Sequence, residues 1–222
     1  MNWGQKVGAI RAALVDAVFA ALPVALVYFS GWAYLTSYLG QFGIDATQFD
    51  VSFTTVLVYA FVPLQSHCVL WMLGGIGALG FLAFLAEIHF SETSKTGKTL
   101  TVVLGLAALM MVIPLLFVIS HLANTAAKEM ADNVWKGDKS QSVMLLSDPK
   151  NDEAAVKSYN VCREGRRLRQ IIGLPDQMFL ICRSAVDPCN RGSLFAVNKD
   201  GHIIYVADKV REDIDVQKIC TN

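Results

Sequence analysis

The apolar residues of this chain form three long runs in its amino-terminal half and short alternating runs toward its carboxyl end. The long runs extend from about residue 12 to 39, from about 56 to 88, and from 100 to 122. A helix that crosses a bilayer needs about 20 mostly apolar residues, at a rise of about 1.5 Å per residue. Each run meets that requirement, so the pattern predicts three transmembrane helices.

The second run is too long for one simple crossing. As a single helix it would measure about 50 Å, whereas the hydrocarbon core is about 30 Å thick. Pro63 removes a backbone donor and disfavours helix at the residue before it, so we expect a break there. The prediction is an interfacial segment at 44–64 followed by a crossing at about 66–88. One long tilted helix, kinked at the proline, is the alternative.

The segment between the first two runs gives two further expectations. Trp32, Tyr34 and Tyr38 cluster at one end of the first run, as in the aromatic belt of a membrane interface. Asp45 is expected to be the N-cap of a short amphipathic helix, with Gln48 at the capping-box position.

The carboxyl-terminal apolar runs are typical of a small sheet. SLFAVN and HIIYVAD flank the turn KDG, which predicts a hairpin, and QMFLICRS is a further strand candidate. The segment 154–172 fits a helix and paired strands equally well. We expect an α-helical membrane protein with a small, mainly antiparallel β domain of α+β class. Its expected divisions are a transmembrane part at 1–122, with helices at about 12–39, 66–88 and 100–122, a helical stalk at 123–141 and a β-rich domain at 142–222.

The charged residues follow the same division. Residues 1–122 carry nine charged side chains and residues 123–222 carry 29, so the formal net charge of zero describes neither part. Short loops rich in Lys and Arg stay in the cytoplasm. Two basic residues precede the first helix and two lie in the loop 89–99, whereas the loop 40–53 has none. This predicts a bacterial inner (cell) membrane protein with a cytoplasmic N-terminus and a periplasmic or extracellular C-terminal domain.

The cysteines support that orientation. Cys68 lies in the membrane part, whereas Cys162, Cys182, Cys189 and Cys220 lie in the soluble part, and none forms a C-x-x-C pair. An even number of this kind is typical of disulfides in an oxidising compartment. We favour Cys182–Cys189 with Cys162–Cys220, because the first two can meet across one loop; buried thiols in a cytosolic domain are the alternative. The spacing does not suit zinc, so no metal or other cofactor is expected.

One side of the second transmembrane helix is lined by small residues, Gly74, Gly77, Ala78 and Gly80. Gly74 and Ala78 form a small-x-x-x-small pair, which lets another helix approach closely. We expect this side to pack against another helix of the same chain, with a second copy of the chain as the alternative.

Few polar residues occur in the membrane part. Counting inward from the end of the second run places Gln65, Ser66 and His67 at the outer boundary of the membrane. We therefore expect a hinge with solvated side chains there, and a buried active site is the alternative. Asp16 is expected to be an interfacial carboxylate, and its alternative role is that of a proton or ion carrier.

The segment CREGRRLRQ contains a basic cluster, Arg163, Arg166, Arg167 and Arg169. Outside the cytoplasm such a cluster binds anionic headgroups, binds the acidic surface of a partner, or is simply solvated. The solvated face is the simplest interpretation. Nucleic acid is not expected unless the topology is reversed.

The sequence contains no G-x-S-x-G, H-E-x-x-H, P-loop or glycine-rich dinucleotide turn, so we do not expect an enzyme. We expect a non-enzymatic inner-membrane protein that displays a disulfide-bonded domain, as a sensor or as a structural subunit of an envelope complex. The expected partners are the lipid bilayer and a protein, either another protein or a second copy. The alternative is an oligomeric channel, a transporter subunit or a membrane effector, such as one in a defence system.

Overall fold

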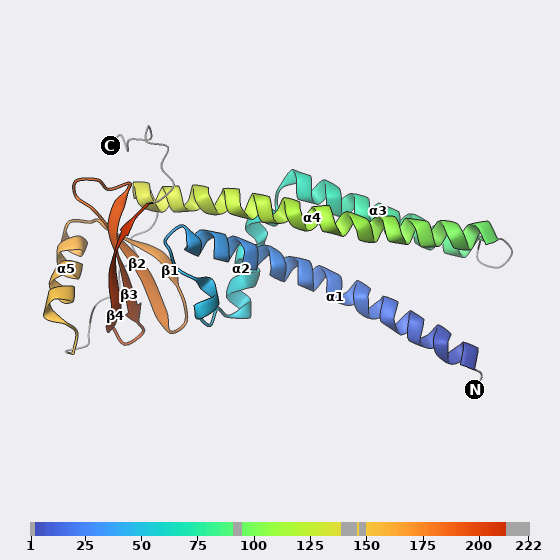
Figure 1. Cartoon of the computed structure of the whole chain (residues 1–222), viewed down its shortest axis with the longest axis horizontal. Coiled ribbons are helices and arrows are strands. Elements are labelled where there is room, and N and C mark those ends of the chain that lie inside the picture. The colour runs from blue at the N-terminus through green and yellow to red at the C-terminus, as the bar shows by residue number, and fades with distance from the viewer. Residues whose placement is uncertain (1–2, 91–94, 139–145, 147–149, 212–222) are drawn as a thin grey trace. The chain divides into compact units, whose positions relative to one another are not determined.

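The computed structural model of the chain describes residues 3–90, 95–138, 146 and 150–211, and the side chains of some helix-end residues are outside that description. The chain divides into two compact units. Unit 1 comprises residues 1–35 and 53–126, and unit 2 comprises residues 36–52 and 127–222. The described residues form five α-helices and one four-stranded sheet (Figure 1): α1 Trp3–Gly40, α2 Phe53–Leu64, α3 His67–Phe90, α4 Lys95–Lys136, α5 Glu153–Glu164, β1 Leu168–Gly173, β2 Gln177–Arg183, β3 Arg191–Asn198 and β4 Ile203–Val210.

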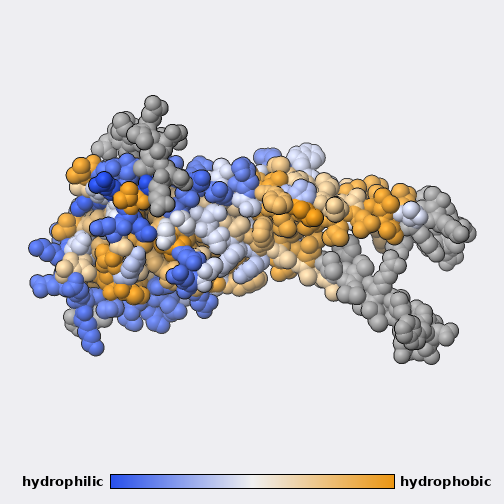
Figure 2. Space-filling view, in the orientation of Figure 1, coloured by the Kyte–Doolittle hydropathy of each residue, from blue (hydrophilic) through white to orange (hydrophobic). Residues whose placement is uncertain are grey.

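Three of the described helices are long and apolar enough to cross a bilayer, by their length and composition. The candidate spans are Ala20–Gly40, His67–Ala86 and Thr99–Lys136, which confirms the prediction of three long apolar helices. Figure 2 shows the hydrophobic surface gathered over the helices of unit 1, while unit 2 is mainly hydrophilic on the face shown. Large apolar side chains of α3 and α4, such as Trp71 and Phe117, are exposed in the described chain.

The long second run divides into two helices, as Pro63 predicted. Helix α2 ends at Leu64 and α3 begins at His67, so one long kinked helix is excluded. The Ser66 amide donates to the Pro63 carbonyl oxygen at 3.4 Å, and this turn separates the two helices. A proline in the last turn of α2 fits this ending, because it lacks the N–H that would continue the hydrogen-bond ladder.

Unit 1 contains a small apolar core and one very close helix contact. Leu26 of α1, Val69 of α3 and Leu115 of α4 belong to the core. At the α1–α2 contact the buried Ser30 hydroxyl donates to the Ala60 carbonyl oxygen at 3.1 Å. A β-carbon added to Gly31 would overlap the backbone of α2, so only glycine permits this approach.

The aromatic residues expected to form an interfacial belt are mostly inside the protein. Tyr34 is buried in unit 1 and stacks on Tyr59, with ring centroids 5.6 Å apart. Tyr38 is buried in unit 2, where its hydroxyl donates to the Ile171 carbonyl oxygen at 3.0 Å. The belt interpretation was therefore wrong for both tyrosines, because each ring has a protein partner.

Asp45 caps a local turn, but the turn is shorter than expected. Its carboxylate accepts from the Thr47 amide at 3.0 Å and from the Thr47 hydroxyl at 2.8 Å. The element that it caps is the 3-10 turn Ala46–Gln48, and the apolar helix α2 begins only at Phe53. The prediction of Asp45 as a cap is confirmed, and the prediction of an amphipathic helix directly after it is wrong.

The sheet in unit 2 is antiparallel throughout, with strand order β1-β2-β3-β4. The predicted hairpin is β3–β4, in which Leu194 pairs with Ala207. Its turn ends on Gly201, whose φ of +78° favours glycine. The ambiguous segment 154–172 contains both α5 and β1, and the Asp152 carboxylate caps α5 by accepting from the Ala155 amide at 3.1 Å.

The two faces of the sheet are covered by different parts of unit 2. Helix α5 covers one face through a core that includes Tyr159 and Phe195, whose rings meet edge to face at 5.6 Å. On the other face Phe49 meets Phe179 edge to face at 5.0 Å. Side chains alternate between the faces of a strand, so both faces of β2 bury apolar residues.

Helix α4 ends at a glycine. Gly137 has a φ of +87°, and the Asp138 amide donates back to the Asn133 carbonyl oxygen at 3.0 Å, as in a glycine C-cap. Arg183 donates to the carbonyl oxygens of Trp135 at 3.1 Å and Lys136 at 2.7 Å. A guanidinium there stabilises the helix, because carbonyl groups at the last turn have no partner within the helix.

Candidate partner-binding groove

A groove of about 780 Å³ lies between α5 and one end of the sheet. One face of α5 forms its first wall, because positions 154, 157, 158, 161 and 162 recur at helical spacing. The end of β2 and the facing ends of β3 and β4 form the remainder. The lining residues are Ala154, Lys157, Ser158, Val161, Cys162, Arg167, Cys182, Arg183, Ser184, Ala185, Arg191, Gly192, Ser193, Asp208, Lys209 and Val210.

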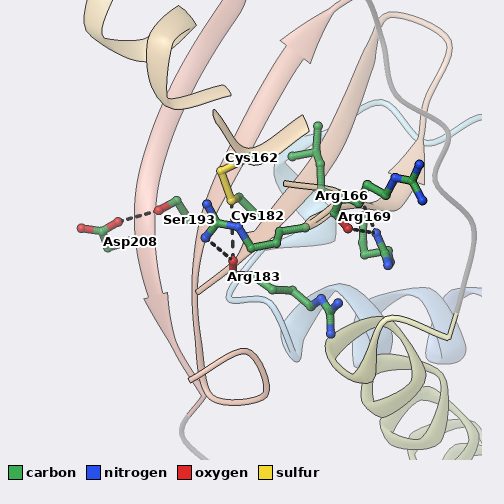
Figure 3. Close-up of a disulfide and its surroundings, with 9 residues drawn as sticks. Cys162, Arg166, Arg169, Cys182, Arg183, Ser193 and Asp208 are labelled. Carbon is green, nitrogen blue, oxygen red and sulfur yellow. Dashed lines mark hydrogen bonds between the residues drawn. A yellow bond between two sulfur atoms is a disulfide. The ribbon is translucent and has the colours of Figure 1, made fainter. Parts of the chain in front are cut away.

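A disulfide between Cys162 and Cys182 lies in this groove (Figure 3), with 5.7 Å between the two α-carbons. Cys162 is in the last turn of α5, and Cys182 is in β2, where it pairs with Ser193 of β3. Both sulfur-bearing side chains belong to the core between the helix and the sheet. The bond therefore ties α5 to a central strand.

The predicted disulfide pairing was wrong. We expected Cys182 to bond Cys189 across a loop, but β2 directs Cys182 toward α5 and its partner is Cys162. Cys189 is also disulfide-bonded, and Cys220 lies outside the described residues. Cys68 is a free, exposed thiol. The error arose because sequence proximity was taken as spatial proximity, whereas the strand alternation of β2 decided the direction of the thiol.

Positive charge predominates along the groove. Lys157, Arg167 and Arg191 line it, and none of the three forms an ion pair with an acidic residue of the described chain. The Arg167 guanidinium donates to the Arg183 carbonyl oxygen at 3.2 Å, which holds it beside the disulfide. Asp208 is the acidic lining residue, and it accepts a hydrogen bond from the Ser193 hydroxyl at 2.9 Å (Figure 3).

The structure divides the four arginines of the predicted basic cluster. Arg167 lines the groove, and Arg166 is exposed, with a φ of +52°. Arg163 is half-buried in the last turn of α5. Arg169 is buried and donates to carbonyl oxygens, including that of Gly137 at 3.2 Å, so its role is structural. The four side chains are therefore not one surface.

Four groove cations were missed in the sequence: Lys157, Arg183, Arg191 and Lys209. Lys157 belongs to α5, and Arg191 is the first residue of β3. Once α5 and the β2–β3 register are known, helical spacing places Lys157 beside Val161, and alternation places Arg191 on the same face as Ser193. The sequence alone did not decide whether 154–172 forms a helix or paired strands. The positions of Lys157 and Arg191 relative to each other therefore could not be recognised.

Burial lowers the pKa of Arg169 in β1 and of Arg183 in β2. Desolvation lowers the pKa of Arg169, and the nearby Asp138 raises it in part. Desolvation also lowers the pKa of Arg183, and the charge of Arg169 lowers it further, against the opposite effect of Asp138. Both guanidinium groups stay in place because they donate to backbone carbonyl oxygens.

The predicted small-residue side of α3 has no neighbour in the described chain. A β-carbon added at Gly74, Gly77 or Gly80 would meet no described heavy atom within 4 Å, and Ala78 is exposed. Gly75, on the adjacent side, makes the close contact within the chain, since its added β-carbon would lie 3.4 Å from a terminal methyl group of Met111.

Gln65, Ser66 and His67 lie where α2 gives way to α3. Gln65 and His67 are exposed, and Ser66 is half-buried, in the turn between α2 and α3. The side chain of Asp16 lies outside the described residues. No group of three or more His, Cys, Asp or Glu residues in the described part of the chain is arranged to hold a metal ion.

Comparison with known proteins does not extend this description. No protein-family model matches the chain, and neither does any curated protein or any solved structure.

Proposed function

We propose that this chain is a non-enzymatic integral membrane protein of the bacterial inner (cell) membrane, with its disulfide-bonded domain outside the cytoplasm. The observation that carries the proposal is the Cys162–Cys182 disulfide in a chain with three helices of membrane-spanning length. Disulfides persist in oxidising compartments and are rare in the cytosol. The basic loops at the amino end and at 89–99 support the same orientation.

Within that location we propose that the domain acts as a sensor or as a structural subunit of an envelope complex. The basic groove beside the disulfide supports this role, because its unpaired cations can meet an anionic partner. The absence of a catalytic signature from the sequence agrees with a binding role.

Reporter fusions test the orientation. Alkaline phosphatase fused after residue 222 should be active and a cytoplasmic fluorescent reporter at the same point should be dark. Among the described cysteines, alkylation of the unreduced protein should modify Cys68 alone, since Cys162, Cys182 and Cys189 are disulfide-bonded. A bright cytoplasmic reporter together with reactive thiols at those three positions would refute the proposal. Native mass in detergent then separates a lone anchor from an assembly.

A further inference from the structure

We propose that the groove between α5 and the sheet binds an acidic, extended segment of a partner protein. The inference rests on the proposed function, and it names the chemistry of the partner. Three features carry it: the charge of the lining, the apolar residues on the walls and the open shape.

Charge selects an anionic occupant. Lys157, Arg167 and Arg191 line the groove, whereas Asp208 is its one acidic lining residue. The described chain supplies no carboxylate to pair with these three cations. A carboxylate that enters the groove meets N–H donors, and charge-assisted hydrogen bonds of this kind are about twice as strong as neutral ones.

The walls also carry apolar residues that face water. Val161 of α5 is 51% exposed and Val210 of β4 is 63% exposed, and both line the groove. An extended peptide directs alternate side chains to opposite sides. A segment that alternates acidic and apolar residues can therefore place carboxylates at the cations and apolar groups on the valines.

The shape favours a peptide over a small molecule. The volume of about 780 Å³ is within the usual range for ligand sites, but such sites bury most of the ligand. This groove is partly open to solvent between helix and sheet, so a small anion would keep more contact with water than in an enclosed site. Its lining has no aromatic side chain, whereas single-stranded nucleic acid is usually bound by stacking on aromatic rings.

The test uses the full chain in nanodiscs of zwitterionic lipid, with a fluorescent peptide of alternating glutamate and valine as the probe. Anisotropy should show saturable binding that weakens as salt is raised, because the attraction is screened. A peptide with lysine in place of glutamate should not bind. Lys157→Glu and Arg191→Glu should each weaken binding at least about tenfold, equivalent to about 1.4 kcal/mol.

Lys199→Glu is the matched control, because Lys199 is an exposed lysine outside the groove that pairs with Asp176 at 3.4 Å. It should bind the peptide as the native chain does. Circular dichroism and an intact disulfide on non-reducing mass analysis show that each variant is folded. Lys157→Gln and Arg191→Gln should weaken binding less than the reversals, and they replace any reversal variant that does not fold.

Three results would overturn the proposal. The first is equal affinity of the native chain and both groove reversals. The second is that the chain binds phosphatidylglycerol vesicles but not the peptide, and that Lys157→Glu and Arg191→Glu weaken the vesicle binding. This result would assign the groove to lipid headgroups. The third is peptide binding only after neutralisation of Glu212, Asp213 and Asp215, which would make the chain's own tail the occupant. Peptide binding is measured on purified protein and does not depend on the orientation that the reporter fusions measure. The proposed function and the proposed peptide site can therefore be refuted separately.

Discussion

The contact between α1 and α2 provides the sharpest test of the packing in unit 1. Gly31→Ala adds one β-carbon at a point where it would overlap the Val56 carbonyl oxygen and lie 2.9 Å from the Val56 carbonyl carbon. These atoms belong to the backbone of α2, so no side-chain rotation relieves the clash. The helices must separate, and the Ser30–Ala60 hydrogen bond lengthens with them.

The expected magnitude is the difference between two opposing effects. Overpacking of a close contact costs about 1–3 kcal/mol, and the upper part of that range applies because backbone is involved. Alanine recovers up to about 1 kcal/mol of helix propensity relative to glycine. The net loss for Gly31→Ala is about 2 kcal/mol in the free energy of unfolding, which lowers the midpoint by about 4–8 °C for a chain of this size.

Thermal unfolding in detergent, followed by intrinsic fluorescence, measures this loss. Gly105→Ala in α4 is the matched control, because its added β-carbon would meet no described heavy atom within 4 Å. Its midpoint should stay unchanged or rise slightly. If Gly31→Ala unfolds at the same temperature as Gly105→Ala, the tight α1–α2 contact is refuted.

Three further predictions concern unit 2. Replacing Cys162 and Cys182 by alanine should lower the free energy of unfolding by about 3 kcal/mol, because the disulfide closes a loop with a sequence separation of 20 residues. Denaturant unfolding of the native chain and the variant, with and without reductant, measures this loss. Arg183→Met leaves two carbonyl oxygens at the end of α4 without their donor, so it should lower the free energy of unfolding by about 1–3 kcal/mol. Arg166→Met, at an exposed side chain, is the control and should change the free energy of unfolding by less than about 0.5 kcal/mol in the same thermal unfolding measurement. Burial raises the pKa of Tyr159 from 10.0 to about 12, against a smaller lowering by Arg163, so its contribution to stability is complete below pH 10.0 and is lost as the pH rises through about 12. Melting at increasing pH, compared with Tyr159→Phe, checks the sign: the native chain should lose more stability than the variant over that range.

The elements that depend on local chemistry were predictable from the sequence. Apolar runs of sufficient length gave the three long helices, and Pro63 gave the break between α2 and α3. The turn before Gly201 gave the β3–β4 hairpin. Each of these depends on a property of the residue itself or of its near neighbours: hydropathy, a missing donor or access to positive φ.

The candidate site was only partly predictable, because its residues come from separate elements. Arg167 was recognised within the basic cluster, but Arg169 from the same cluster is buried and donates to the Gly137 carbonyl oxygen. Lys157 and Arg191 join Arg167 only after α5 folds over the sheet. A charge count cannot tell which cations share a groove.

The sequence by itself determined where the chain is apolar, where the break between α2 and α3 and the β3–β4 hairpin lie, and which cysteines are available to bond. Only the tertiary structure decided that Cys162 bonds Cys182, that Gly31 and not the Gly74–Gly80 side makes the tight helix contact, and that five dispersed cations line one groove. The physical reason is that hydropathy and turn preference act over a few residues. Contacts across a helix pair or a sheet depend on the direction in which each side chain is turned once distant elements pack.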